Sequence, residues 1–121
     1  MVSTGPIVQV FGRDDSQATR RCLRFFRERR MPLSFVDMAR RPMAPAELRR
    51  FRQQFGARAL LDESGKAYRD AGLAWLRLGD DELEQRLLAE PRLLRLPLAR
   101  FGTELSVGVD EALWKTWQQR S

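Results

Sequence analysis

The stretch that decides the fold is IVQVFGRDDSQATRRC, residues 7–22. Residues 7–11 form a short apolar run that is rich in β-branched side chains and ends at Gly12, which predicts a buried strand. Residues 14–16 (DDS) are typical of a helix start, and the helix that follows is expected to reach about Arg30. One face of this helix is apolar at helical spacing and should be buried: Ala18, Cys22, Phe25 and Phe26.

The segments on either side of this helix define the sheet. Pro32 follows the helix, and residues 33–37 (LSFVD) alternate like a second strand, so the opening predicts a βαβ unit with a parallel pair. Residues 96–99 and 105–107 flank a loop that contains glycine and predict a hairpin. The order β-α-β, then helices, then β-β-α predicts an α/β protein. Its mixed four-stranded sheet would be covered by helices and would carry a helical insertion.

The middle and the end of the chain should be helical. Pro45 suits the first position of a helix that Gly56 closes, because its missing N–H is not needed there. Residues 67–71 predict a short helix, another runs from Asp80 to the residue before Pro91, and Asp110 should cap the last one. The side chains expected to face inward are Leu48, Phe51, Phe55, Leu83, Leu87, Leu88, Leu113 and Trp114. Arg49, Arg50 and Arg52 should be solvated, and Trp75, Trp114 and Trp117 should pack late elements onto the sheet, with Trp117 partly exposed.

Composition limits the class of protein. The 121 residues are expected to form a single domain, residues 1–121. A formal charge of +6, from 22 Lys and Arg against 16 Asp and Glu, is compatible with an anionic partner, either nucleic acid or an acidic protein surface. An ordinary solvated surface is the simpler interpretation, and a nucleic-acid partner is not favoured. With one cysteine and no histidine, no disulfide, metal site or cofactor is predicted.

The location of the protein follows from two further features of the sequence. Residues 1–6 lack the basic start and the apolar stretch of a signal peptide. No apolar run approaches the roughly 20 residues that a membrane span requires. We therefore expect a cytoplasmic protein without a membrane partner.

A series of motifs resembles the ArsC/Spx-type family, the arsenate reductase-like and glutaredoxin-like proteins. Residues 10–21 (VFGRDDSQATRR) resemble the strand–loop–helix opening of that family. The same register continues through FFRERR at 25–30, FVD at 35–37, PAEL at 45–48, LLAEPRLL at 87–94, and then Pro97 and residues 107–108. The resemblance covers almost the whole chain and implies a thioredoxin-like fold. It also implies that Pro97 is a cis-proline, in a loop that offers its backbone to an extended partner chain.

The resemblance also implies a chemistry that this chain does not match. Reductases of the family attack arsenate or accept a disulfide with a cysteine at the helix start, where free N–H groups and the positive end of the helix dipole stabilise a thiolate. The matching position here is Ser16, which needs a base, and the chain has no histidine. Asp15 could accept a proton, but its charge also repels an oxyanion. Ser16 is therefore expected to be part of a helix cap, whose N–H groups could still bind an anion or a backbone carbonyl.

The arginines that hold the oxyanion in the family are also replaced. Their positions correspond to Leu96, to Ser64, and to Ser106 or Val109. Arg95 and Arg100 lie close by in the sequence and could supply one of them, but not the set. Cys22 is the only thiol, and it lies on the expected buried face of the helix, so we expect it to pack in the core.

These observations favour a non-catalytic ArsC-like protein that acts as a protein-binding or regulatory module. The candidate binding residues are Asp15, Ser16, Leu96 and Pro97. A second candidate surface is a basic stripe at helical spacing, made of Arg20, Arg24 and Arg27. Two alternatives stay open. One is a glutaredoxin-like or arsenate reductase-like oxidoreductase that uses Cys22 or a partner thiol, and the other is an Spx-like transcriptional regulator that contacts RNA polymerase.

Overall fold

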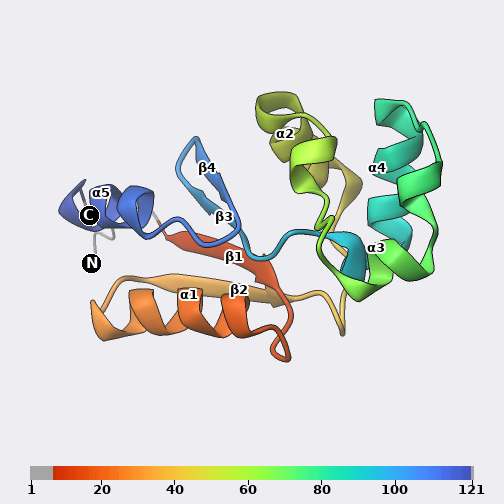
Figure 1. The fold of residues 1–121 in the computed structure, drawn as a ribbon. Helices are drawn as coiled ribbons and strands as arrows, with labels where there is room; N and C mark the ends of the chain where they lie inside the picture. Colours follow the sequence, from red (N-terminus) through yellow and green to blue (C-terminus); the bar gives the residue numbers. More distant parts are fainter. Residues whose placement is uncertain (1–6, 121) are drawn as a thin grey trace. The chain divides into compact units, whose positions relative to one another are not determined.

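The computed structural model describes residues 7–120, so the expectation about a signal peptide at residues 1–6 lies outside the described residues. The chain divides into two compact units (Figure 1). We call residues up to Arg41, together with those from Leu96 onward, the sheet unit, and Pro42–Arg95 the helical unit. The expectation that residues 1–121 behave as one domain stays a prediction.

The sheet unit contains a mixed four-stranded sheet in the order β2-β1-β3-β4, which confirms the predicted architecture. Strand β1 (Val8–Gly12) pairs in parallel with β2 (Leu33–Asp37) and antiparallel with β3 (Leu98–Phe101). Strand β4 (Glu104–Val107) completes the hairpin with β3. The parallel pair requires a crossover, which helix α1 (Gln17–Glu28) provides along the strands (Figure 1).

One face of the sheet is buried against α1 and the last helix, α5 (Glu111–Arg120). Val8 and Val10 from β1 meet Phe26 from α1 and the rings of Trp114 and Trp117 from α5 in one hydrophobic cluster. Trp114 donates a hydrogen bond from Nε1 to Ser106 Oγ at 3.1 Å, so its polar atom is satisfied inside the core. The predicted partial exposure of Trp117 is wrong, because its ring is buried and stacks on Phe101 and Phe26.

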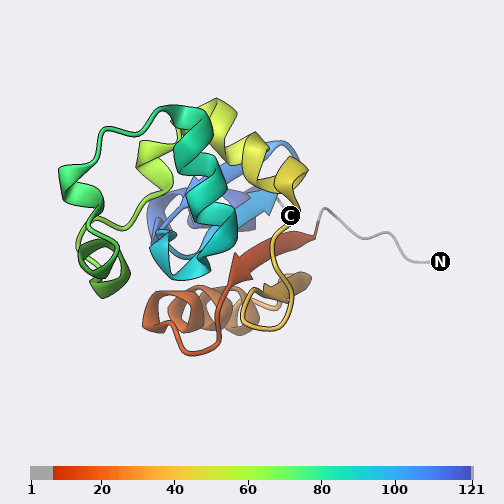
Figure 2. The ribbon, with the colours of Figure 1, turned by 90° about the vertical axis from the view of Figure 1, so that its right-hand side faces the viewer.

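The helical unit consists of three α-helices and three short 3-10 turns. The α-helices are α2 (Pro45–Phe55), α3 (Lys66–Asp70) and α4 (Asp80–Ala89), and Figure 2 shows α2 and α4 side by side. The turns are Arg58–Leu60, Leu73–Trp75 and Pro91–Leu93. Pro45 begins α2 and Gly56 ends it with φ of 85°, as predicted. The apolar residues Leu48, Phe51, Leu83 and Leu87 are buried, whereas Phe55 and Leu88 are half-buried.

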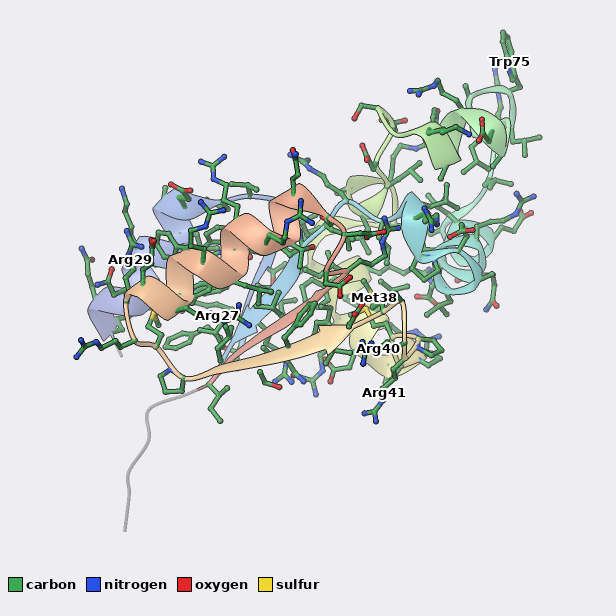
Figure 3. All side chains as sticks on the ribbon, turned by 90° about the horizontal axis from the view of Figure 1, so that it is seen from below. Arg27, Arg29, Met38, Arg40, Arg41 and Trp75 are labelled. Carbon is green, nitrogen blue, oxygen red and sulfur yellow. The ribbon has the colours of Figure 1, made fainter. Side chains whose placement is uncertain are left out.

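Two expectations about the helical unit are wrong. Trp75 does not pack onto the sheet. Its side chain is 89% exposed in the short turn that follows Gly72, and Figure 3 shows it pointing outward from that turn. Arg52 is not fully solvated, since it shares the carboxylate of Glu84 with Arg49 across α2 and α4. Glu84 is only 3% exposed, and the guanidinium of Arg49 is the main group that holds its pKa below the ordinary value.

Candidate functional site

The candidate site lies at one end of the sheet, where the loop after β1 and the chain entering β3 are neighbours. Phe11 pairs with Leu98, so the residues that follow β1 and those that precede β3 leave the sheet at the same edge. This pairing places two of the segments selected from the sequence, Asp15–Ser16 and Leu96–Pro97, at the same edge of the sheet. The peptide bond between Leu96 and Pro97 is cis, which confirms the expectation drawn from the resemblance.

Leu96 presents its backbone at this end. The ring of Pro97 is buried, and its carbonyl accepts a hydrogen bond from the N–H of Gly108 at 2.8 Å. Leu96 is half-buried, and within residues 7–120 its own N–H and C=O make no hydrogen bond. Backbone polar groups near a protein surface that lack an internal partner are available to a ligand. The segment before β3 therefore offers one donor and one acceptor from the same residue.

Ser16 is the N-cap residue of helix α1. Ser16 has extended backbone angles, and its Oγ accepts a hydrogen bond from the N–H of Thr19 at 3.2 Å, which confirms the predicted capping role. The first two helical N–H groups, of Gln17 and Ala18, have no acceptor within the described part of the chain. The Ser16 hydroxyl is thus already engaged in the structure of its own helix.

Charge around the helix start comes from Arg13 and Asp15. Arg13 donates from Nε to Asp15 Oδ1 at 2.9 Å, and its side chain is only 16% exposed. Arg20, which sequence reasoning placed on the basic stripe, donates from Nη1 to the carbonyl of Asp14 at 2.7 Å and so fixes the same loop. Arg13 was missed by sequence reasoning, although its position directly after Gly12 could have marked it as a residue of this loop.

A close contact between Gly12 and Thr19 sets how tightly α1 packs against the end of β1. A Cβ built on Gly12 would lie 2.4 Å from Thr19 Oγ1, which leaves room only for glycine. The same hydroxyl accepts a hydrogen bond from the N–H of Arg13 at 3.4 Å. Thr19 is fully buried, whereas Ala18, which was expected on the buried face, is half-buried. The buried face of α1 is therefore rotated toward Thr19 at its first turn.

Cys22 lies away from this end of the sheet, on the core face of α1. Its side chain has no exposed surface, as predicted, and burial raises the pKa of the thiol to about 12. A thiol in this state is neither ionised near neutral pH nor accessible to a substrate.

Ser64, Leu96, Ser106 and Val109, the positions that the resemblance matched to oxyanion-binding arginines, do not lie in a cluster of guanidinium groups among the described residues of the sheet unit. Ser106 is buried against Trp114, and Ser64 donates its hydroxyl to Asp62 within the helical unit. Val109 is exposed, and Arg100 donates to Gln9 Oε1 from the middle of β3. Arg95, the other possible substitute, belongs to the helical unit. The described residues of the sheet unit therefore bring no set of arginines together at these positions.

The basic stripe remains a separate surface. Arg20, Arg24 and Arg27 are all exposed on α1. Beside it, a hollow of about 360 Å³ is lined by Arg21, Arg24, Phe25, Glu28, Arg29 and Glu111. Arg21 binds the carboxylate of Glu111 at 2.7 Å and lowers its pKa, so part of this positive charge is neutralised within the chain.

The described residues also bear on metals and membranes. Residues 7–120 contain no group of three or more His, Cys, Asp or Glu side chains placed to hold a metal ion. Within the same range, no helix combines the length and the apolar character required to cross a bilayer.

The sheet order, the crossover helix and the hairpin of β3 and β4 define a thioredoxin-like α/β protein. The model of the ArsC family matches residues 12–117, and the chain belongs to this family. No curated protein matches the chain.

Several solved structures share the fold. The YFFB (PA3664) protein has a TM-score of 0.82 at 17% identity, over 92% of this chain and 98% of its own. An ArsC family related protein from Bacteroides fragilis has a TM-score of 0.81 at 13% identity, over 91% and 96% of the two chains. An arsenate reductase from Vibrio cholerae has a TM-score of 0.75 at 19% identity, over 86% and 91%. At these identities the likeness shows the fold.

Proposed function

We propose that this chain is a cytoplasmic, non-catalytic member of the ArsC family that binds a partner protein through the helix-start/Pro97 face. We define this face as Asp15, Ser16, Leu96 and Pro97. It combines the unpaired backbone groups of Leu96 with the free N–H groups at the first turn of α1. A partner segment in extended conformation would pair its backbone with Leu96, as strand-adding ligands do.

The observation that carries the proposal is the state of the two groups that could act as nucleophile. Ser16 Oγ caps α1 by accepting the N–H of Thr19, and no imidazole exists in the sequence to activate it. The sulfur of Cys22 is fully buried, with a thiol pKa of about 12. A reductase of this fold requires a thiolate that reaches its substrate, and neither group supplies one.

The charges of the face indicate which segment it would accept. The loop before α1 carries two carboxylates, Asp14 and Asp15, against one guanidinium, that of Arg13, which already binds Asp15, so it does not offer the free cationic groups that an oxyanion requires. A neutral extended peptide meets no such requirement, because it is held through its main chain. We therefore favour a protein segment over a small anion as the ligand of this face.

The first experiment measures turnover. Purified wild-type protein is assayed for reduction of arsenate and of a low-molecular-weight disulfide with glutathione as reductant, alongside Cys22→Ala. We expect no turnover above the uncatalysed rate from either protein. Turnover that persists in Cys22→Ala would contradict an inert site, and turnover that disappears in it would support a role for the buried thiol.

The second experiment tests the face. A photo-crosslinking residue is introduced in place of Leu96, and in a matched control in place of Thr103, which is exposed in the β3–β4 turn at the opposite end of the sheet. We expect a defined crosslinked species in cells from position 96 and none from position 103. Equal crosslinking from both positions would argue against this face. A partner lost on reversing Arg24 and Arg27 to Glu, which leaves the bond of Arg20 to the helix-start loop in place, would put binding on the basic stripe.

An ArsC-like oxidoreductase is the second candidate function. It is supported by the family match over residues 12–117 and by the fold shared with the arsenate reductase from Vibrio cholerae. In that case the missing thiolate would have to come from a partner protein, and turnover would appear only when that partner is present.

A further inference from the structure

Strand β2 is an edge strand with an open hydrogen-bonding side. The N–H of Val8 bonds to the carbonyl of Pro32, and the N–H of Met38 bonds to the carbonyl of Gly12. In a parallel ladder with these two end bonds, Ser34 and Val36 face β1. The N–H and C=O groups of Leu33 and Phe35, and the N–H of Asp37, therefore point away from the sheet. No group within residues 7–120 bonds to them.

A polar hollow lies along the same strand. It has a volume of about 450 Å³ and is lined by Gln9, Ser34, Phe35, Val36, Asp37, Arg40 and Arg41, all in the sheet unit. Because side chains alternate along a strand, Ser34 and Val36 are on the sheet face opposite to Leu33 and Phe35, which pack against the core. A strand added beside β2 would send every second side chain over this hollow.

The ends of β2 carry unbalanced positive charge. Arg40 and Arg41 follow the strand and are exposed, and Figure 3 shows both at its carboxyl end, with Arg27 on the same side of the molecule. Arg30, also exposed, precedes the strand. The one carboxylate that lines the hollow, that of Asp37, is 14% exposed and lies 3.9 Å from Nε of the exposed Arg40, which is a long and therefore weak ion pair.

This charge pattern distinguishes between two possible occupants. If two copies of this chain paired antiparallel along β2, with Phe35 opposite Phe35, the turn that carries Arg30 in each copy would come next to the turn that carries Arg40 in the other. Like charges brought together at an interface are unfavourable, so the arginines oppose self-pairing. The same arginines attract a strand whose ends are acidic.

We propose that the open edge of β2 accepts an extended segment of a partner protein as a fifth strand. The segment would carry acidic residues on both sides of a core of about five residues, because the five residues of β2 span about 17 Å between Arg30 on one side and Arg40 and Arg41 on the other. Its backbone would bond to Leu33, Phe35 and Asp37. This surface lies on β2 rather than at the helix-start/Pro97 face, so the inference does not depend on the proposed function.

The test uses a synthetic peptide with two acidic residues at each end of an alternating Val-Thr core, followed by amide NMR of the isotope-labelled full chain. We expect the amide signals of Leu33, Phe35 and Asp37 to shift on titration and their hydrogen exchange to slow. Ser34 and Val36, which already bond to β1, should change less. Two control peptides should not produce this pattern: the same core with lysines at its ends, and the acidic peptide N-methylated at alternate positions of its core.

Charge-reversal variants test the role of the arginines. Arg40→Glu combined with Arg41→Glu should weaken binding of the acidic peptide about tenfold or more, while Arg50→Glu combined with Arg92→Glu, an equal change in net charge, should not. The proposal is overturned if the N-methylated peptide binds equally well, if the shifts centre on Leu96 instead of β2, or if no acidic peptide shifts these amides. A stable dimer in sedimentation experiments on the free protein would also overturn it.

Discussion

The reactivity of the single thiol, Cys22, tests directly whether this residue could act as a nucleophile. Burial raises the pKa of Cys22 from 9.0 to about 12, which means about a thousandfold less thiolate at any pH below 9 than in the unfolded chain. The sulfur also has no exposed surface, so a reagent reaches it only in opened molecules. With an opening free energy of about 5 kcal/mol, the open fraction is about 10⁻⁴, and reaction through that fraction sets the observed rate.

The assay follows the reaction of an aromatic disulfide reagent with the native protein and with the protein unfolded in guanidinium chloride. We expect Cys22 to react at least about a thousandfold more slowly in the native state, and the native rate to rise with small additions of denaturant. A native rate within about tenfold of the unfolded rate would refute the burial argument, and with it the exclusion of Cys22 as a nucleophile.

The double variant Ser16→Cys with Cys22→Ala supplies the matched comparison, because it moves the only thiol to the helix start. There the sulfur is at the surface beside the free N–H groups of α1, so its pKa should fall below about 8.5 and it should react in the native state. The loss of the serine cap costs about 1 kcal/mol, which leaves the fold intact. A slow native reaction of this thiol would show that the helix start is closed to ligands, which would contradict the proposed binding face.

Four further outcomes follow from the same geometry. Between about pH 9 and 12 the unfolded chain has lost the proton of Cys22 while the folded chain keeps it. As pH rises through this range, the free energy of unfolding should therefore fall by up to about 4 kcal/mol. Denaturant melts at several pH values measure this fall, which should be smaller in Cys22→Ala. Gly12→Ala should cost about 1–3 kcal/mol because its Cβ meets the Thr19 hydroxyl, and Thr19→Ala in the same chain should recover part of that loss; full stability of the single variant would contradict the contact. Glu84→Gln should lower the free energy of unfolding by about 2 kcal/mol at neutral pH. The difference in stability from wild type should shrink as pH falls through the lowered pKa of Glu84, because protonation removes the same ion pairs from the wild type. A difference that stays unchanged in acid would argue against these ion pairs. Iodide should quench the fluorescence of the exposed Trp75 but not that of the buried Trp114 and Trp117. The variant Trp75→Phe reports the two buried tryptophans alone, and iodide quenching of its fluorescence would show that solvent reaches the core beneath α5.

Local pattern was sufficient to predict the sheet. Residues 8–12 and 33–37 are apolar or alternating runs bounded by helix and turn signals, and in a short chain such runs form few stable structures other than strands. Helix limits were also close, because Pro45, Gly56, Asp110 and Ser16 act within one turn of their own position. The cis bond at Pro97 was expected from the family resemblance, since the sequence around one proline does not fix its isomer.

Side-chain environment was harder to predict. Trp75, Trp117 and Glu84 were assigned wrongly or missed, since burial depends on which elements meet, and Glu84 is buried only because two arginines on α2 face it from 32 and 35 residues away in the chain. The rotation of α1 that buries Thr19 instead of Ala18 has the same origin, in the close approach of α1 to Gly12.

For the function, the sequence by itself determined that the helix start carries the hydroxyl of Ser16 and that the chain has no histidine to activate it. Only the tertiary structure decided that the single thiol is buried in the core, that Leu96 has unpaired backbone groups beside a cis-proline, and that β2 has an open edge between Arg30 and the pair Arg40 and Arg41. The physical reason is the distance along the chain over which each effect acts. Residue identity and caps act within a turn or two of chain, whereas burial, pKa and unpaired backbone groups depend on neighbours that come from distant parts of the sequence.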